Sequence, residues 1–284
     1  MNHLVVIDPG MLTLVQDLGR GSYASQGVAR SGAADLASHA LAQRLCGNRP
    51  TAAGLEVLLG GLRLRTAQAC IMAVTGALLE VSVDGVPQGI NHAFAVPAGS
   101  VLALSQASIG MRAYVAVRGG LAVEEVLGSR SRDTLGGLGP APLAAGDALP
   151  IGDHTDEPAW LDVAAVRAPR DEITLSIASG PHDNILDAMG WRTLLQTEWH
   201  IDSRSDRIGF RLDGPALEAP AADIASFPVL AGCVQLPGDG RPMILGPDCG
   251  VTGGYPVLGM VSQDGLDALA QVRPGHSVRF RRSN

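Results

Sequence analysis

The sequence contains no lysine: all 21 of its basic residues are arginine, against 28 aspartate and glutamate residues. A Walker A phosphate loop needs a lysine, a Schiff-base mechanism needs a reactive amine, and a biotin carrier needs a lysine to modify. The absence of lysine therefore excludes all three roles for this chain. Any anion that it binds must be held by arginine side chains, helix N-termini or backbone amides.

Aromatic residues are scarce, at 4%, so the core is expected to be filled by valine, leucine, isoleucine and alanine. The cysteines form no C-x-x-C pair, which predicts free thiols in a reducing compartment. They are Cys46, Cys70, Cys233 and Cys249. The seven histidines are scattered without metal-ligand spacing, so no metal site is expected.

The net charge of −7 argues against nucleic acid or an anionic membrane as the main partner. Residues 1–10 lack the basic region and apolar run of a signal peptide. The longest apolar stretch, 69–83, is interrupted by Thr75, Gly76 and Glu80, so it is not expected to span a membrane. These features predict a cytoplasmic protein.

The 36 glycines and 18 prolines indicate frequent turns between short strands. In the first half the expected strands are 4–7, 12–15, 55–59, 62–64, 69–74, 78–83, 93–96, 101–104 and 113–117. Asp84-Gly85 predicts a two-residue hairpin turn. Strands at this spacing favour a closed barrel or sandwich over a parallel sheet with alternating helices.

One clear helix is predicted in the first half, over 33–46, with Ser31 as its N-cap and Gly47 ending it. The second half repeats the strand-rich pattern. Strands are expected at 173–177, 198–201 and 277–281 and around Val234, Ile244 and Val261, with helices at 183–189 and 264–271. The stretch 153–170 lacks periodicity and predicts a linker between domains at 1–152 and 171–284.

Polar residues in glycine-rich settings mark the candidate site. Arg20 and Arg30 are suited to bidentate recognition of a carboxylate or phosphate, and Ser31 with the following amides can bind the same anion. The stretch 128–139 predicts a long loop, either functional or mobile. Ser129 in that loop has no histidine in any of these motifs to activate it, so it is interpreted as a loop serine that makes backbone hydrogen bonds.

These motifs carry a resemblance to a known family. In order they read T-x-V-Q-D-x-G-R, G-V-x-R-S-G-A-x-D, L-E, T-G-A, R-G-G, L-G-S-R-S, S-D-R-x-G-x-R-L-x-G, V-Q-x-P-x-D-G and T-G-G-Y-P, from Thr13 to Pro256. The chain resembles the biotin-dependent carboxyltransferase family, also called allophanate hydrolase subunit 2. Its members include the C component of 5-oxoprolinase and the sporulation kinase-inhibitor antagonist.

The resemblance implies two cyclophilin-like β-barrel domains with a few short helices, and an enzyme that is inactive without its partner. It implies a second cyclophilin-like subunit, similar to the B component of 5-oxoprolinase, and a ring-opening subunit, similar to its A component. The complex would use ATP, with magnesium, to hydrolyse 5-oxoproline to glutamate. Biotin would not be covalently bound to this chain.

Two alternatives stay open: the carboxyltransferase half of a biotin-dependent urea carboxylase or allophanate hydrolase system, and a non-catalytic module that antagonises a kinase inhibitor. Departures from the usual motifs, such as Gly21-Ser22 after Arg20 and Ala34 before Asp35, weaken assignment to one substrate. No catalytic residue is assigned. The expected substrate-binding residues are Asp17, Arg20, Arg30, Ser31, Asp35, Glu56, Arg118, Ser205, Asp206, Arg207, Gln235, Thr252 and Tyr255.

Overall fold

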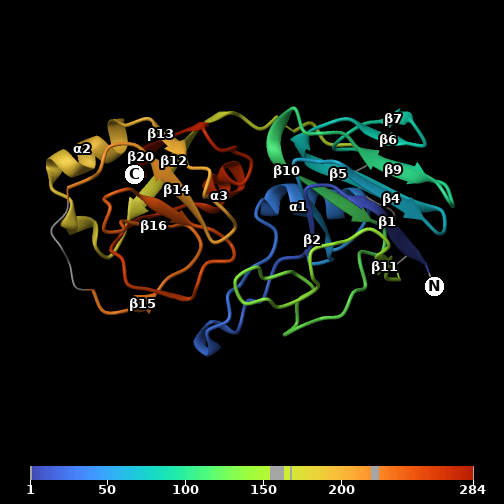
Figure 1. Cartoon of the computed structure of the whole chain (residues 1–284), viewed down its shortest axis with the longest axis horizontal. Helices are drawn as coiled ribbons and strands as arrows, with labels where there is room; N and C mark the ends of the chain where they lie inside the picture. Colours follow the sequence, from blue (N-terminus) through green and yellow to red (C-terminus); the bar gives the residue numbers. More distant parts are fainter. Residues whose placement is uncertain (1, 154–162, 167, 219–223, 284) are drawn as a thin grey trace.

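The computed structural model describes residues 2–153, 163–166, 168–218 and 224–283. Strands predominate in this part of the chain, beside three α-helices, which confirms the mostly β fold class predicted from the sequence. Two lobes lie side by side along the long axis of the molecule, one for each half of the sequence (Figure 1). None of the described helices is long and apolar enough to cross a membrane.

The first lobe consists of two antiparallel sheets and one helix. The six-stranded sheet has the order β11 (Ala148–Pro150), β1 (His3–Pro9), β4 (Leu62–Thr66), β9 (Val101–Leu104), β6 (Val81–Val83), β7 (Val86–Gln88). The five-stranded sheet has the order β2 (Leu12–Gln16), β3 (Gly54–Leu58), β10 (Ile109–Val117), β5 (Cys70–Leu78), β8 (Ala93–Val96). One helix, α1 (Leu36–Leu45), packs on β5 and β10.

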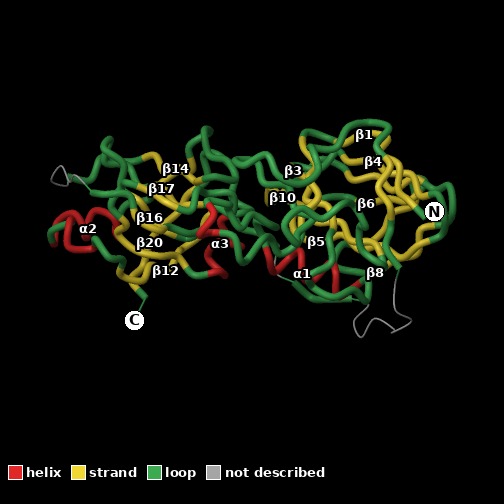
Figure 2. The backbone as a smooth tube through the Cα atoms, turned by 90° about the horizontal axis from the view of Figure 1, so that it is seen from below, coloured by secondary structure: helices red, strands yellow, loops and turns green. Residues whose placement is uncertain are grey.

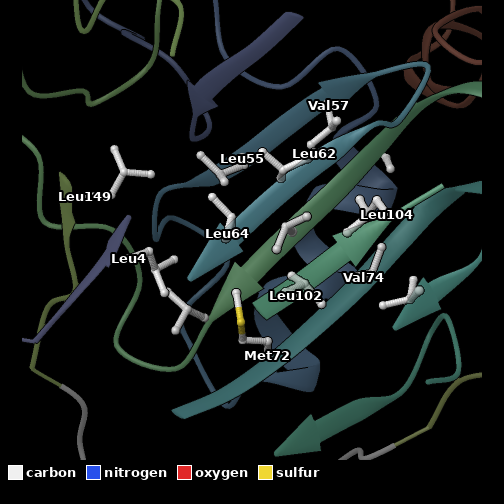
Figure 3. Close-up of a cluster of buried hydrophobic side chains, with 14 of the residues drawn as sticks. Leu4, Leu55, Val57, Leu62, Leu64, Met72, Val74, Leu102, Leu104 and Leu149 are labelled. Atoms are coloured by element: carbon white, nitrogen blue, oxygen red, sulfur yellow. The ribbon is translucent and has the colours of Figure 1, made fainter. Parts of the chain in front are cut away.

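The core of this lobe is aliphatic, as the scarcity of aromatic residues predicts. On β4, Leu62 and Leu64 are buried whereas Arg63 and Arg65 are exposed, because successive side chains of a strand point to opposite faces. Figure 3 shows the inward-facing leucines and valines of this core between the strands. Among the described residues of this buried cluster, Phe94 is the one aromatic residue.

The predictions for the segment 69–88 of the first lobe were correct for the hairpin turn and inaccurate for the strand bounds. Asp84 and Gly85 join β6 to β7 with φ angles of 49° and 81°, which confirms the predicted hairpin. The two strands predicted at 69–74 and 78–83 are present as β5 (Cys70–Leu78) and β6 (Val81–Val83), but their bounds differ from the predicted ones, because β5 continues past residue 74 through Gly76. There φ is 88°, and an added Cβ would lie 2.4 Å from the Arg112 carbonyl oxygen, so this glycine accommodates a register irregularity between β5 and β10 instead of ending the strand.

Helix α1 starts later than predicted, and Ser31 is not its N-cap. Asp35 takes that position, and its side chain accepts a hydrogen bond from the Ser38 amide at 2.8 Å. The Ser31 amide donates to the Pro247 carbonyl in the other lobe, and the Ala33 amide donates to the Asp17 carbonyl. These tertiary contacts take the chain before Asp35 out of the helical path.

The second lobe is a closed seven-stranded barrel. Its order is β12 (Glu172–Ser179), β19 (Val257–Val261), β16 (Cys233–Gln235), β17 (Met243–Leu245), β14 (Gly209–Asp213), β13 (Trp199–Ile201), β20 (Ser277–Arg282). Strands β12 and β20 pair in parallel and close the barrel. A short ribbon, β15 (Phe227–Pro228) with β18 (Thr252–Gly253), lies beside it. Strand β14 was not predicted.

Figure 2 shows one helix at the outer end of the second lobe and another at the end that faces the first lobe. The helix predicted at 183–189 was misplaced: a 3-10 turn covers Asp183–Ile185, and α2 spans Ala188–Gln196 behind an Asp187 cap. The last helix, α3 (Gln263–Leu269), lies within one to two residues of its predicted bounds. Trp199, Phe210 and Phe280 join the core of this lobe, so the expectation of an aliphatic core fits only the first lobe.

The two lobes are contributed by separate parts of the sequence. The strands of the two sheets end at Pro150, and those of the barrel begin at Glu172. Much of the predicted linker at 153–170 lies outside the described residues.

Candidate active site

The predicted site residues fall into three places. Seven of them meet at the boundary between the lobes: Asp17, Arg20, Arg30, Ser31, Asp35, Glu56 and Arg207. Ser205 and Asp206 line a small hollow beside Glu56 and Arg207. Arg118 donates to the Cys46 carbonyl inside the first lobe. The remaining three belong to the second lobe: Gln235 is on β16, Thr252 is on β18, and Tyr255 follows β18.

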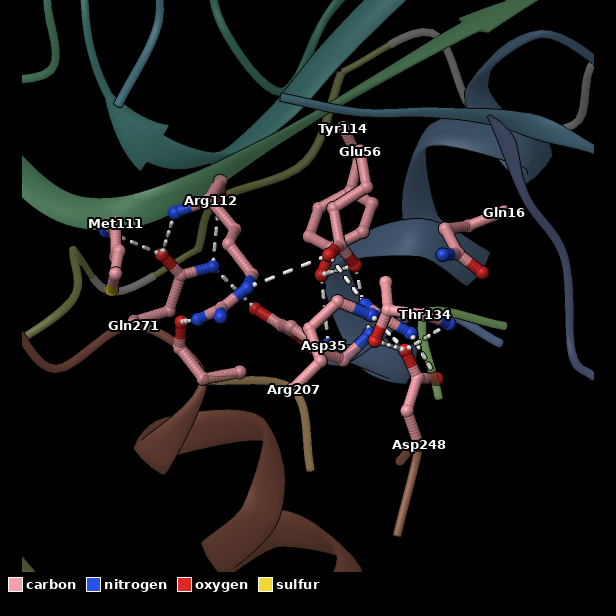
Figure 4. A network of polar contacts seen from close by, with 12 residues as sticks. Gln16, Asp35, Glu56, Met111, Arg112, Tyr114, Thr134, Arg207, Asp248 and Gln271 are labelled. Atoms are coloured by element: carbon pink, nitrogen blue, oxygen red, sulfur yellow. Dashed lines mark hydrogen bonds and ion pairs between the residues drawn. The ribbon is translucent and has the colours of Figure 1, made fainter. Parts of the chain in front are cut away.

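Glu56 is the centre of the boundary network (Figure 4). It projects from β3 and is 4% exposed. Its Oε1 accepts from Nη1 of Arg207 at 2.6 Å, and its Oε2 accepts from the Ala34 amide and the Tyr114 hydroxyl, each at 2.9 Å. Burial by itself would raise the pKa of Glu56, but Arg207 and Arg112 outweigh it and hold the pKa below its usual value.

Arg207 links the two lobes. It comes from the second lobe, where its Nε and Nη2 donate to both carboxylate oxygens of Asp248 at 2.8 and 3.0 Å. Its Nη1 reaches Glu56 and its Nη2 reaches the Gly32 carbonyl, both in the first lobe. Burial opposes its charge, yet Glu56 and Asp248 raise its pKa above the usual value. The nitrogens of Arg207 are thus engaged by acceptors within the protein.

A second set of contacts joins the lobes through Gln271, which follows α3. Its amide nitrogen donates to Asp35 at 2.7 Å, and its amide oxygen accepts from the backbone amides of Met111 and Arg112. The Arg112 guanidinium donates in return to the Ala270 carbonyl. Burial raises the pKa of Asp35 despite these hydrogen bonds. Asp35 therefore serves both as a helix cap and as part of the boundary.

Asp267 on α3 adds a titratable contact at this boundary. Its Oδ1 accepts from the Leu36 amide at 2.9 Å. Burial, together with the nearby Asp35, raises its pKa to about 6. An unfolded aspartate titrates near pH 3.9, so the folded state binds more protons between about pH 4 and pH 6.

We expect the free energy of unfolding to fall as the pH rises through this window, because ionisation of Asp267 and Asp35 is costly in the folded state. In Asp267→Asn this fall should be smaller, since the amide oxygen can still accept from Leu36 without taking up a charge. Urea unfolding at pH 4, 5, 6 and 7 measures the difference, with Asp264→Asn on the same helix as the control for loss of one charge. Equal slopes for the wild type and Asp267→Asn would contradict the prediction.

Asp17 and Arg20 hold the glycine-rich loop over 128–139. Asp17 accepts from the Ser129 hydroxyl at 2.6 Å and from the Arg130 amide at 2.7 Å. Arg20 is 2% exposed; its Nε donates to the Val126 carbonyl, and its other nitrogens donate to the hydroxyl and carbonyl oxygens of Ser131. Burial lowers the pKa of Arg20 although acidic groups surround it. These contacts anchor the loop against the boundary.

A cavity of about 210 Å³ opens beside this network, between the lobes. Its walls are mostly apolar: Leu18, Ala33 and Leu36 from the first lobe, and Phe210, Val229 and Leu230 from the second. Among the described residues that line it, Arg30 is the one with a charge, and its Nε donates weakly to the Leu18 carbonyl at 3.3 Å. In the described part of the chain the terminal nitrogens of Arg30 contact no acceptor, so this guanidinium is available to an anion. Cys249 also lines the cavity, but burial raises the pKa of its thiol to about 12, which makes it a poor nucleophile.

The network positions the loop that carries Arg30. Ser31 has a φ of 55°, unusual for a non-glycine residue, and its amide bonds to Pro247. The Gly32 carbonyl is held by Arg207, and the Ala34 amide is held by Glu56. The buried charges thus fix the backbone at Arg30 while leaving its side chain at the cavity.

Of the predicted residues Gln235, Thr252 and Tyr255 of the second lobe, Tyr255 lines a different hollow. Tyr255 is 48% exposed beside a groove of about 1,010 Å³ on the barrel. Gln235 is buried on β16, and Thr252 is exposed on β18. They do not approach Arg30 or the Glu56 network through any of the contacts found in the described residues.

Sequence reasoning missed five residues of the boundary network: Arg112, Tyr114, Thr134, Asp248 and Gln271. Arg112 did carry a signal, because it is a charge at the start of an otherwise apolar strand pattern. Asp248 follows Gly246-Pro247 and resembles an ordinary turn residue. Its hydrogen bonds to Thr134 cross between lobes, and nothing local in the sequence indicates that.

A magnesium nucleotide does not fit the described residues of this chain by themselves. No group of three or more histidine, cysteine, aspartate or glutamate side chains is arranged there to hold a metal ion. The cavity at Arg30 is smaller than the roughly 300–1,000 Å³ typical of sites for drug-sized ligands. Arg30 is moreover the one cation among the described residues that line this cavity.

Comparison with known proteins places these features in a family. The family description "Carboxyltransferase domain, subdomain A and B" matches residues 26–282. The C component of 5-oxoprolinase from Escherichia coli (strain K12) is 32% identical over 281 residues, which cover 98% of this chain and 90% of that protein.

Two solved structures have the same fold. TTHA0988 matches with a TM-score of 0.90 and 33% identity, over 99% of this chain and 55% of that chain. The Kluyveromyces lactis urea carboxylase matches with a TM-score of 0.91 and 26% identity, over 99% of this chain and 27% of that chain. This chain therefore spans about half of the first structure and about a quarter of the second. The similarity confirms the cyclophilin-like, carboxyltransferase-type fold expected from the sequence motifs. Because the family description covers nearly all of its length, the chain belongs to the carboxyltransferase domain family, subdomains A and B.

Proposed function

We propose that this chain is the C-type subunit of an ATP-dependent 5-oxoprolinase and that its interdomain cavity receives 5-oxoproline. The complex would convert 5-oxoproline, ATP and water into glutamate, ADP and phosphate. A second cyclophilin-like subunit would complete the active site, and a third subunit would open the ring. The free cysteines among the described residues agree with a cytoplasmic location.

The available guanidinium of Arg30 at an apolar cavity is the observation that carries the proposal. 5-Oxoproline has one carboxylate and an otherwise compact ring. A planar guanidinium can hold a carboxylate through two parallel hydrogen bonds. The leucine, valine and alanine walls suit the ring methylenes, and about 210 Å³ suits a small metabolite.

ATP with magnesium is assigned to the assembled complex and not to this chain by itself. The described residues do not form a metal or triphosphate site, so the partner would supply the missing groups. The side chains proposed to act here are those that bind and orient: Arg30 holds the substrate carboxylate, and Glu56 and Arg207 hold the Arg30 loop in place.

ATP hydrolysis by the chain co-purified with its partners, with and without 5-oxoproline, tests the proposal. We expect turnover that requires both the partners and 5-oxoproline. Arg30→Gln should lower kcat/KM for 5-oxoproline about 10- to 100-fold, the effect of losing a hydrogen bond to a charged group. Arg30→Lys keeps the charge and should lose less, and Arg65→Gln, exposed on β4, should have no effect. A complex that is assembled but not stimulated by 5-oxoproline would refute the proposal.

A second candidate is the carboxyltransferase half of a biotin-dependent urea-carboxylating system, favoured by the structural match to a urea carboxylase. Urea is neutral and offers Arg30 no carboxylate. If urea is the substrate, biotin-dependent turnover of urea should appear with added carboxylase and biotin carrier, and Arg30→Gln should change the KM for urea little. Partner binding without turnover of either substrate would instead favour a regulatory binding module.

A further inference from the structure

The proposed reaction uses the boundary between the lobes and leaves one large feature of the second lobe without a role. A groove of about 1,010 Å³ lies on the barrel, and two of the sequence motifs, at 235–240 and 252–256, form much of its wall. Two glycines widen it: a Cβ at Gly238 would meet nothing within 4 Å, and one at Gly254 would touch its neighbours only at 3.8 Å or more. Its volume is at or above the upper limit of about 1,000 Å³ for drug-sized ligands, so it suits a segment of polypeptide better than a metabolite.

The floor of the groove is apolar. Leu217, Leu236 and Pro256 are buried beneath it, and Ile185 and Pro237 lie beside them. Tyr255 stands at the groove and is 48% exposed, the highest exposure of any aromatic residue that the structure describes. A large exposed aromatic ring in a chain with 4% aromatic residues is typical of a binding surface.

The charge around the groove has one sign. Asp187, Glu218 and Asp239 line it and are exposed, and among the described residues that line it there is no arginine or histidine. The basic residue that is nearest in sequence to Asp239 is Arg241, and it forms an ion pair with Asp213, which does not line the groove. Acidic groups around an aromatic ring favour the binding of a guanidinium or ammonium group. Such a group can form ion pairs with the carboxylates at the rim of the groove and stack on Tyr255.

We propose that this groove docks an extended segment of a partner protein, one that carries arginine or lysine next to apolar residues. The apolar residues would contact Leu217, Leu236 and Pro256, and the basic side chain would lie over Tyr255 between Glu218 and Asp239. The inference does not depend on the reaction proposed above, since none of its residues belongs to the Arg30 cavity.

An array of eight-residue peptides of varied sequence, probed with the fluorescently labelled full-length protein, tests the specificity. We expect the bound peptides to be enriched in arginine or lysine beside leucine, valine or proline. The best peptide and a matched peptide with its basic residues replaced by glutamate are then compared by fluorescence polarisation. Equal binding of the two, or no peptide bound above background, would overturn the proposal.

Variants of the groove then locate the binding. The double variant Glu218→Gln with Asp239→Asn should bind the basic peptide about three- to tenfold more weakly, as expected for two exposed ion pairs. Tyr255→Ala should also weaken binding, whereas Tyr255→Phe keeps the ring and most of the affinity. The double variant Glu80→Gln with Glu124→Gln removes the same charge from the first lobe and should bind like the wild type. Equal weakening in both double variants would show non-specific charge attraction and overturn the assignment to this groove.

Discussion

Replacing Arg207 with alanine is expected to lower the free energy of unfolding by about 3–5 kcal/mol, because it leaves Asp248 buried without its ion-pair partner and leaves Glu56 with the more distant Arg112, at 3.5 Å. Glu56 and Asp248 are 4% and 0% exposed, so water does not compensate for the lost ion pairs. The change also removes the hydrogen bond to Gly32 that joins the lobes. Urea unfolding followed by tryptophan fluorescence measures the loss.

Arg204→Ala is the matched control for this experiment. It removes an arginine three residues away that is 67% exposed and pairs only with Asp202 in the described structure, so its effect should be below about 1 kcal/mol. Glu56→Gln should lower the free energy of unfolding less in the Arg207→Ala background than in the wild type. In that background the Glu56 carboxylate has already lost its main partner. A loss below about 1 kcal/mol for Arg207→Ala would contradict the assignment of Arg207 as the link between the lobes.

Gly19→Ala is expected to reduce the activity of the assembled complex by about 100-fold, the loss that a displacement of about 1 Å at a reacting group can cause. At Gly19 the φ is 81°, and an added Cβ would lie 2.3 Å from the Arg30 carbonyl oxygen and 2.6 Å from that of Ser31. The backbone that carries Arg30 must therefore move. The measurement is kcat/KM for 5-oxoproline-dependent ATP hydrolysis.

Gly27→Ala is the control that distinguishes displacement of the Arg30 backbone from the strain of placing alanine at a positive φ. Gly27 has nearly the same φ, 83°, but an added Cβ would meet nothing within 4 Å. Both variants carry the cost of a left-handed conformation, so both should lose some stability, but only Gly19→Ala should lose most of its activity. Equal activity in the two variants would show that the Arg30 loop is not part of the substrate site.

The strand pattern illustrates what local sequence information predicts well. The strand predicted at 62–64 and the Asp84-Gly85 turn each depend on neighbouring residues, and both predictions were confirmed. Local information failed where another part of the chain overrode it. The helix predicted from residue 33 loses its first turn because Pro247, Asp17 and Glu56 accept hydrogen bonds from the amides of Ser31, Ala33 and Ala34, respectively.

The candidate site shows the same division. The motifs directed attention to Arg20, Arg30, Glu56 and Arg207 as anion-binding or orienting groups. The structure places Arg20 and Arg207 in contact with acceptors of the protein itself and leaves the guanidinium of Arg30 at a cavity. A sequence shows that an arginine is present, but whether its charge is used internally depends on which distant carboxylates fold against it.

The sequence by itself determined the mostly β class, the free thiols, the absence of any lysine chemistry and the family motifs, because these depend on residue identity and short-range pattern. Only the tertiary structure decided which charged residues join the lobes and which face a cavity or the acidic groove. Those outcomes depend on contacts such as Glu56 with Arg207, 151 positions apart. Burial of such a pair is set by the packing of two independently patterned lobes, and no local signal encodes that.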